Sequence, residues 1–309
     1  MYKVLFVSTG FIGDRLLTTS AMAVAKRYYP DIKTYYYLSS DFSYMNEVLL
    51  STGIVDGIIT DKTEIDGRWD SVFTMPHCRF DTNPVRVYCE SFIENLPIDA
   101  DLTPAFVDVT KLNTSENFTI PTTDYITYQV DWQNRTSLDV ELIISLLQNK
   151  GITCIPVGSL QKQQNEFSFG SNEFIQQEQL RRYSLNETFK LIAGAKMHLC
   201  MNGGTAMFSG YVHTRCAMTT DWFYIRHNER RLDPYAYLNW IKQTPRDMSG
   251  NPIHHMFNPN ITEEELVTEV SHMLTCMHDF ILPPNLIKYP QLIDFFVRND
   301  SVSFNSVQK

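Results

Sequence analysis

The sequence predicts an α/β protein made of two successive halves, each a parallel sheet with helices on both faces. Short apolar runs alternate with helical patterns over residues 4–96, and the same alternation starts again at residue 124. A polar stretch rich in Asn and Thr, flanked by Pro104 and Pro121, separates the two series and is the candidate linker. Alternation of strand and helix is typical of parallel sheets, and 309 residues suffice for two domains of ordinary size.

The first half opens on an apolar run at residues 4–7, which predicts a buried strand. It does not predict a signal peptide, because no small-residue cleavage site follows the run. The helical spacing of Leu17, Ala21 and Val24 predicts a helix closed by Pro30. The other elements expected in this half are strands at 33–38, 55–60 and 69–74, a helix ended by Gly53, and a helix over 85–96 ended by Pro97.

The second half opens on an expected strand at 124–130 and a helix that Gly151 stops. The Ser-Leu-Asn-Glu run at 184–187 and the Thr-Glu-Glu-Glu run at 262–265 are capping boxes, and each predicts the start of a helix. Further strands are expected at 152–157 and 197–201, the second followed at once by a glycine turn and a short apolar helix.

Composition excludes several classes of protein. A net charge of -9 argues against a protein whose main task is to coat nucleic acid. No apolar run approaches the length of about eighteen residues that a membrane-spanning helix needs, so we expect no transmembrane segment and a cytoplasmic protein. The six cysteines include no C-x-x-C pair, and no Cys/His group has ligand spacing. Reduced thiols and no metal site are therefore expected.

The most informative stretch is the glycine turn between the first strand and the first helix. It contains Gly10, Phe11 and Gly13, and Asp14 follows within the first helical turn. Backbone N–H groups in such a turn, together with the positive end of the helix, favour a phosphate or a sugar. Asp14 is therefore a candidate general base beside a binding site. Its alternative role is to stabilise the helix through its charge in the first turn.

A second glycine turn follows the strand expected at 197–201 and consists of Asn202, Gly203, Gly204 and Thr205. The two glycines allow the backbone to approach a diphosphate, and Thr205 offers an N–H group at a helix start. Ligands of parallel sheets bind at the carboxyl ends of the strands, so we expect the two turns to face each other across a cleft. The alternative is an ordinary strand-to-helix turn.

The run at residues 10–31 has a Gly-Asp turn, a leucine-threonine run and a Tyr-Pro-Asp close. It resembles the opening of glycosyltransferase family 9, the heptosyltransferase-like family. The helix expected after residue 184 and the Asn-Gly-Gly-Thr turn resemble two later patterns of that family, in the same order. The resemblance implies a GT-B fold, in which two Rossmann-like domains face each other across a cleft. It implies an acceptor domain at 1–118, a nucleotide-sugar domain at 119–282, and a helical tail at 283–309 that can cross back to the first domain.

The resemblance also implies an inverting transfer of a sugar from a UDP- or ADP-sugar to an acceptor hydroxyl, with no obligatory metal or cofactor. Asp14 matches the proposed base of the family. The expected donor contacts are Asn202, Gly203, Gly204, Thr205, Arg135, Gly158 and Glu187, and those on the acceptor side are Gly10, Phe11, Gly13 and Arg79. The capping role of Glu187 competes with its donor role. Asn202 and Met207 stand where the family has Asp and His, so ADP-heptose is not carried over as the donor.

Two other classes fit parts of the sequence. The glycine turn at 9–13 is similar to that of nicotinamide-dependent epimerases and dehydrogenases. However, Val7 stands where their fingerprint needs Gly, and the Tyr-x-x-x-Lys spacing at 29–33 is misplaced for their catalysis. The degraded second turn favours a catalytically inactive GT-B-like binding protein. Binding of NAD would indicate the first class, and the absence of donor hydrolysis the second.

The acceptor is open between a glycan and a hydroxymethylated base in phage DNA. The many Tyr, Phe, Asn and Met residues and the poor match to bacterial members are compatible with a phage-encoded protein of the host cytoplasm. A DNA acceptor requires a basic cleft and extrusion of the base. The residues expected to line such a cleft are Arg79, Arg86, Arg226, Arg230, Arg231, Trp222 and Phe223. The oligomeric state is also open.

Overall fold

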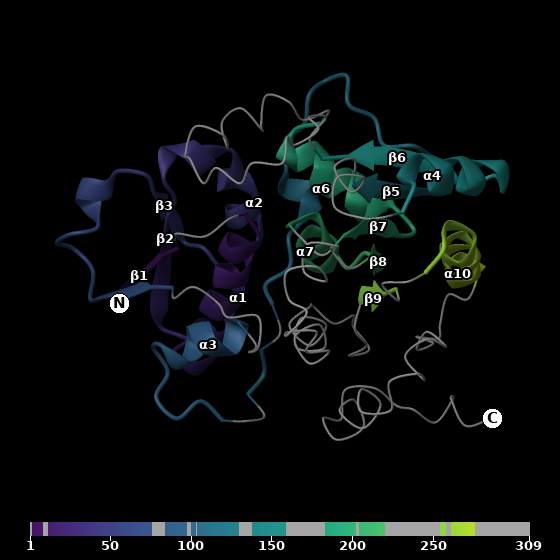
Figure 1. Cartoon of the computed structure of the whole chain (residues 1–309). Helices are drawn as coiled ribbons and strands as arrows, with labels where there is room; N and C mark the ends of the chain where they lie inside the picture. Colours follow the sequence, from purple (N-terminus) through teal and green to yellow (C-terminus); the bar gives the residue numbers. More distant parts are fainter. Residues whose placement is uncertain are drawn as a thin grey trace.

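The structure is a computed structural model that describes residues 2–8, 12–75, 84–97, 100–102, 104–129, 138–158, 183–201, 204–219, 254–257 and 261–275. These residues form two parallel sheets, one in each half of the chain (Figure 1). The α/β fold with two successive sheets is therefore confirmed.

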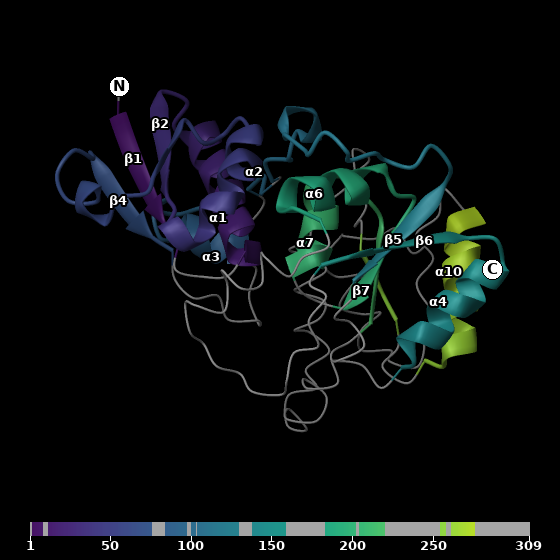
Figure 2. The ribbon, with the colours of Figure 1, turned by 90° about the horizontal axis from the view of Figure 1, so that it is seen from above.

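The first sheet has the strand order β3-β2-β1-β4, and all its pairs are parallel. Its strands are β1 (Tyr2–Val7), β2 (Ile32–Tyr37), β3 (Gly57–Ile59) and β4 (Ser71–Thr74). They are connected or followed by α1 (Ile12–Tyr28), η1 (Ser40–Met45), α2 (Asn46–Ser51), η2 (Lys62–Glu64) and α3 (Pro84–Glu90). Figure 2 shows α1, α2 and α3 on the side of this sheet that is turned toward the second half.

The second sheet has the order β6-β5-β7-β8-β9 and is also parallel. Its strands are β5 (Tyr125–Gln129), β6 (Thr153–Val157), β7 (His198–Met201), β8 (Cys216–Thr219) and β9 (His254–Met256). Its helices are α4 (Val140–Asn149), α6 (Leu185–Gly194), α7 (Gly204–Tyr211) and α10 (Glu263–Thr275), while η3 (Val109–Lys111) lies in the connection between the halves. The pair α6 and α7 faces the first half, and α4 and α10 cover the opposite face (Figures 1 and 2).

Local sequence signals account for many of these boundaries. Both capping boxes are confirmed: Ser184 and Glu187 exchange backbone and side-chain hydrogen bonds at the start of α6, as do Thr262 and Glu265 at α10. Gly151 follows α4 with a φ of +80°. Residues other than glycine adopt this left-handed backbone conformation only at a cost in free energy. The capping residues and Gly151 therefore mark the same helix boundaries as the apolar pattern.

Two expectations need correction. The helix expected over 85–96 ends at Glu90, because the amides of Ser91 and Phe92 turn to carbonyls three residues back and Asn95 takes a left-handed φ of 54°. Pro97 therefore does not end it. Strands β8 and β9 were not predicted from the sequence.

One apolar core joins the two halves. It contains Leu16 and Val24 of α1 together with Phe189 of α6 and Phe208 of α7. The rings of Phe189 and Phe208 stack with centroids 4.6 Å apart. A second core lies between the other face of the second sheet and the helices α4 and α10. The halves are therefore held together by buried apolar surface, which is the dominant favourable contribution to folding.

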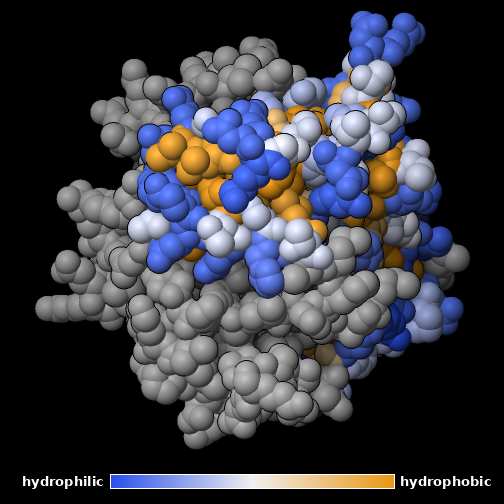
Figure 3. Space-filling view, turned by 90° about the vertical axis from the view of Figure 1, so that its right-hand side faces the viewer, coloured by the Kyte–Doolittle hydropathy of each residue, from blue (hydrophilic) through white to orange (hydrophobic). Residues whose placement is uncertain are grey.

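The outer side of the second half carries hydrophilic side chains around a smaller apolar area (Figure 3). Leu142 of α4 is 40% exposed. Isolated apolar side chains are normal on a protein surface. Among the helices that the structure describes, none combines the length and the apolar character needed to cross a membrane.

Four of the six cysteines lie within the described residues, and none of these four forms a disulfide. Burial raises the pKa of Cys89 and of Cys154 to about 12, so both stay protonated at neutral pH. Cys78 and Cys276 lie outside the described residues. In the same part of the chain, no group of three or more His, Cys, Asp or Glu side chains is placed to hold a metal ion.

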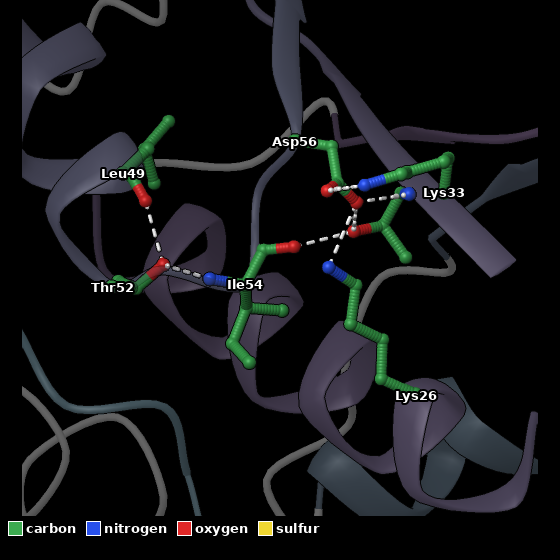
Figure 4. A network of polar contacts seen from close by, with 7 residues as sticks. Lys26, Lys33, Leu49, Thr52, Ile54 and Asp56 are labelled. Carbon is green, nitrogen blue, oxygen red and sulfur yellow. Dashed lines mark hydrogen bonds and ion pairs between the residues drawn. The ribbon is translucent and has the colours of Figure 1, made fainter. Parts of the chain in front are cut away.

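A polar network around Asp56, the residue before β3, links this strand to α1 and β2 (Figure 4). Its carboxylate lies 2.8 Å from Nζ of Lys26 on α1 and 3.0 Å from Nζ of Lys33 on β2, and it accepts the Thr34 backbone N–H at 2.8 Å. Partial burial raises the pKa of Asp56, but these hydrogen bonds and the charge of Lys26 outweigh it and lower the pKa to about 2. The ionised carboxylate therefore stabilises the fold.

We expect Asp56→Asn to lower the free energy of unfolding by about 1 kcal/mol at pH 7, allowing for solvent screening of the pair. Because the folded-state pKa lies below the ordinary value of 3.8, this contribution is present above pH 4. It disappears as the pH falls toward 2, where wild type and variant should converge. Urea unfolding between pH 2 and 7 measures the difference, with Asp124→Asn at an exposed ion pair as the control. A constant gap between wild type and Asp56→Asn across this range would contradict the assignment.

Candidate functional site

The first half of the site lies where the strand order of the first sheet reverses. The chain leaves β1 toward β2 on one side, whereas β4 pairs with β1 on the other side. Such switch points open a crevice at the carboxyl ends of the strands, where ligands of α/β proteins bind. Gly13 and Asp14 lie here, in the first turn of α1. Asp14 is partly buried, and its backbone carbonyl accepts the Thr18 hydroxyl at 2.9 Å.

A buried cation lies next to Asp14 in the sequence. Arg15 is 4% exposed, its Nη1 donates to the Ser8 carbonyl at 3.0 Å, and its guanidinium carbon lies 3.8 Å from the centroid of the Phe42 ring. No carboxylate among the described residues forms an ion pair with Arg15. The guanidinium thus adds positive charge to the amino end of α1, which already favours anions. The sequence analysis did not predict this role of Arg15. The available signal was its position beside Leu16 and Leu17, which places a charged residue among the buried positions of α1.

The second half of the site lies at the switch point of the second sheet. Strands β6 and β7 pair with opposite sides of β5. Thr205, in the first turn of α7, donates its hydroxyl to Oε1 of Gln129 at 2.9 Å, and Gln129 is the last residue of β5. Gly158 follows β6 with a φ of +100°, which only glycine adopts without strain. Gln129 thus lies in the candidate site, although it carried no motif and was not predicted.

The two switch points are linked through their helices. Strands β1 and β7 run toward the same side of the molecule, the lower side in Figure 2, so α1 and α7 begin on that side. The hydroxyl of Tyr211 on α7 donates to the Leu16 carbonyl of α1 at 2.8 Å and also contacts Oγ of Ser20. The structure therefore brings together the helix that carries Asp14 and the helix that begins at Gly204.

Several expected site residues lie outside the described residues: Gly10, Phe11, Arg79, Arg135, Asn202, Gly203, Trp222, Phe223, Arg226, Arg230 and Arg231. Of the expected basic cleft, only Arg86 is described. Its guanidinium pairs with Glu90 at 3.3 Å and donates to the Pro97 carbonyl at 2.8 Å. These bonds tie Arg86 to its own helix and to the chain that follows it.

Glu187 has a structural role. Its Oε2 accepts the Ser184 backbone N–H at 2.9 Å, and its Oε1 accepts the N–H and the hydroxyl of Ser115 at 3.1 and 2.6 Å. Burial raises the pKa of Glu187, but these hydrogen bonds outweigh that effect and lower it. Both carboxylate oxygens are thus engaged in capping α6 and fixing the connecting segment. The capping explanation is confirmed, and this geometry does not support a ribose contact.

No protein-family model matches the chain, and no curated protein matches its sequence. Solved structures do match. Heptosyltransferase WaaC of E. coli with ADP has a TM-score of 0.56 and 14% identity, over 87% of this chain and 99% of that one. ADP-heptose LPS heptosyltransferase II of E. coli has a TM-score of 0.55 and 11% identity, over 88% and 98%.

A third structure, a family 9 glycosyltransferase from Veillonella parvula, has a TM-score of 0.54 and 10% identity, over 89% of this chain and 97% of that one. The chain has the GT-B fold of these glycosyltransferases. Nearly the whole length of each neighbour is covered, so the likeness extends over both halves of this chain. The likeness to family 9 read from the sequence is therefore confirmed at the level of the fold.

Proposed function

We propose that the protein is an inverting glycosyltransferase that moves a sugar from a UDP- or ADP-sugar to an acceptor hydroxyl, without an obligatory metal. The observation that carries this is the contact of Tyr211 with Leu16 and Ser20, because it holds the helix that carries Asp14 against the helix that begins at the other switch point. The names of two structural neighbours mention ADP and ADP-heptose, which supports a nucleotide-sugar donor. The acceptor domain would be 1–118 and the donor domain 119–282, with a tail at 283–309.

In this mechanism Asp14 takes the proton of the acceptor hydroxyl. The acceptor oxygen attacks the anomeric carbon from the face opposite the diphosphate and forms the new glycosidic bond. The bond between the anomeric carbon and the diphosphate oxygen breaks, and its electron pair leaves with the nucleoside diphosphate. Backbone N–H groups at the start of α7, at Gly204 and Thr205, would stabilise the charge that develops on the leaving group.

In this proposal the acceptor hydroxyl is part of either a glycan or a hydroxymethylated base of phage DNA. The net charge of -9 and the internal pairing of Arg86 favour the glycan. Binding to duplex DNA that weakens steeply with salt would select the base instead.

A thermal-shift panel of UDP-glucose, ADP-glucose, ADP-heptose and NAD tests the donor, because binding to the folded state raises Tm. Nucleotide-sugar hydrolysis without acceptor then tests the chemistry. A shift with NAD alone would indicate a nicotinamide enzyme. Binding of a nucleotide-sugar without any hydrolysis or transfer would indicate an inactive GT-B-like binding protein.

Thr205→Val is expected to raise the dissociation constant of the nucleotide-sugar about 5- to 10-fold. Valine keeps the shape of the side chain but removes the bond to Gln129 that fixes the first turn of α7, a loss of about 1 kcal/mol. Isothermal titration calorimetry measures the change. The control is Thr214→Val, which removes a buried hydroxyl bonded to the Ile192 carbonyl at 2.7 Å, beyond the other end of α7. Equal affinities of the two variants would count against a donor site at Thr205.

A further inference from the structure

Tyr211, in the second half, is in contact with two other parts of the chain. It is the last residue of α7 and 1% exposed. Its hydroxyl donates to the Leu16 carbonyl of α1 at 2.8 Å, and its oxygen is in hydrogen-bond contact with Oγ of Ser20 on the same helix. Its own carbonyl accepts the N–H of Val107, in the segment that connects the halves, at 2.9 Å. The first half, the connection and the second half therefore meet at this residue.

The positions of these contacts along the helices matter for the site. Leu16 is two residues from Asp14 and lies in the first turns of α1. Tyr211 lies six residues after Thr205 on α7, a separation of about 9 Å along a helix. Helix α7 thus extends from Gly204 and Thr205, which we call the donor turn, to a contact with the part of α1 that carries the proposed base. Burial raises the pKa of Tyr211, so its hydroxyl keeps its proton and remains a donor.

We propose that Tyr211 is a positioning residue for sugar transfer, whose hydroxyl sets the place of Asp14 relative to the donor turn of α7. The inference rests on the proposed glycosyltransferase function. Reacting groups must be held within a fraction of an ångström, and a misplacement of about 1 Å can lower a rate about 100-fold. A bond between the two helices is the kind of contact that fixes such a distance.

The apolar packing between the halves does not depend on this hydroxyl. Leu16, Leu17, Met207 and Phe208 belong to the shared core through side chains that phenylalanine at position 211 would leave in place. Tyr211→Phe therefore removes the bond and keeps the packing. Its expected consequence is a small change in the placement of α1 relative to α7 without loss of the fold.

Tyr125 offers a matched control inside one half. It is buried at the start of β5, and its hydroxyl donates to the Leu191 carbonyl of α6 at 2.8 Å. Tyr125→Phe, like Tyr211→Phe, deletes one buried phenolic donor and leaves one helix carbonyl without it. The difference between the two variants is whether the lost bond connects the halves.

The experiment compares wild type, Tyr211→Phe and Tyr125→Phe by melting temperature, UDP and ADP binding, steady-state hydrolysis of the nucleotide-sugar, and amide hydrogen exchange. We expect both variants to lose about 2–4 °C in Tm and to bind the nucleotide within about threefold of wild type. Only Tyr211→Phe should lower kcat, by about 10- to 100-fold with KM nearly unchanged. Only this variant should speed amide exchange in the first turns of α1.

Equal kcat values for the two phenylalanine variants, or unchanged exchange in α1 of Tyr211→Phe, would overturn the inference while leaving the proposed function in place. A wild type that neither binds nor hydrolyses any nucleotide-sugar would instead remove the proposed function, and the positioning role with it. Ser20→Ala reaches the same contact from α1 and replaces Tyr211→Phe if that variant does not fold. It is expected to lower kcat less, because the bond to Leu16 remains, and an unchanged kcat in a folded Ser20→Ala then overturns the inference.

Discussion

Asp14→Asn is expected to lower turnover by about 100- to 10,000-fold while the nucleotide-sugar still binds within about threefold of wild type. Asparagine has the size of aspartate and keeps an oxygen at the same place, so the first turn of α1 is retained. It cannot take the proton of the attacking hydroxyl, which must then leave to water. Steady-state transfer or hydrolysis, together with titration of UDP or ADP, separates the two effects.

The alternative role of Asp14 is electrostatic stabilisation of the amino end of α1, worth about 0.3–1 kcal/mol. Glu141→Gln is the matched control, because Glu141 is the acid in the first turn of α4, on the far side of the second half. Both variants should lose a similar, small part of the free energy of unfolding. Turnover that survives in Asp14→Asn, at the level of Glu141→Gln, would refute the base assignment.

Phe189→Ala is expected to lower the free energy of unfolding by about 3–5 kcal/mol. Phe189 is fully buried, stacks on Phe208, and belongs to the core that both halves share. Its loss leaves a cavity between α6 and α7, in the core that also contains Leu16 and Val24 of α1. Amide exchange should therefore become faster in the first half as well as in the second. Denaturant unfolding and hydrogen exchange measure these two consequences.

Phe257→Ala removes the same chemical group from the other core, which packs against α4 and α10. We expect a comparable loss of stability but faster exchange only in the second half. If Phe189→Ala also left the amides of α1 unchanged, the shared core would not couple the halves. The contact of Tyr211 with Leu16 would then be the main link between them.

Sequence reasoning succeeded for features that are encoded within one turn or one strand. The capping boxes at Ser184 and Thr262 were predicted because their partners lie three residues away. The glycine turn after the first strand likewise marked the start of α1, and apolar runs marked β1, β2, β5 and β6. These signals also carried the likeness to family 9, which the solved structures confirm for the fold.

The bonds that assemble the site were not predictable in this way. Tyr211 reaches Leu16 across 195 positions of the chain, Thr205 reaches Gln129 across 76, and Glu187 reaches Ser115 across 72. None of these residues forms a motif with its partner, since the spacing between them reflects only the length of the intervening elements. Similarly, no motif in the sequence distinguishes Arg15 from an exposed helix charge, and only the structure shows that it is buried and lies over the Phe42 ring.

The sequence by itself determined two parallel α/β halves, the glycine turn with Asp14, and the helix starts, because each depends on periodicity or hydrogen bonds over a few residues. Only the tertiary structure decided that the halves share one core, that α1 and α7 are in contact through Tyr211, and that Glu187 also accepts hydrogen bonds from Ser115 of the connecting segment. The physical reason is that these depend on which distant surfaces are buried together. Which surfaces are buried together is determined by packing over the whole fold, so no local sequence pattern predicts it.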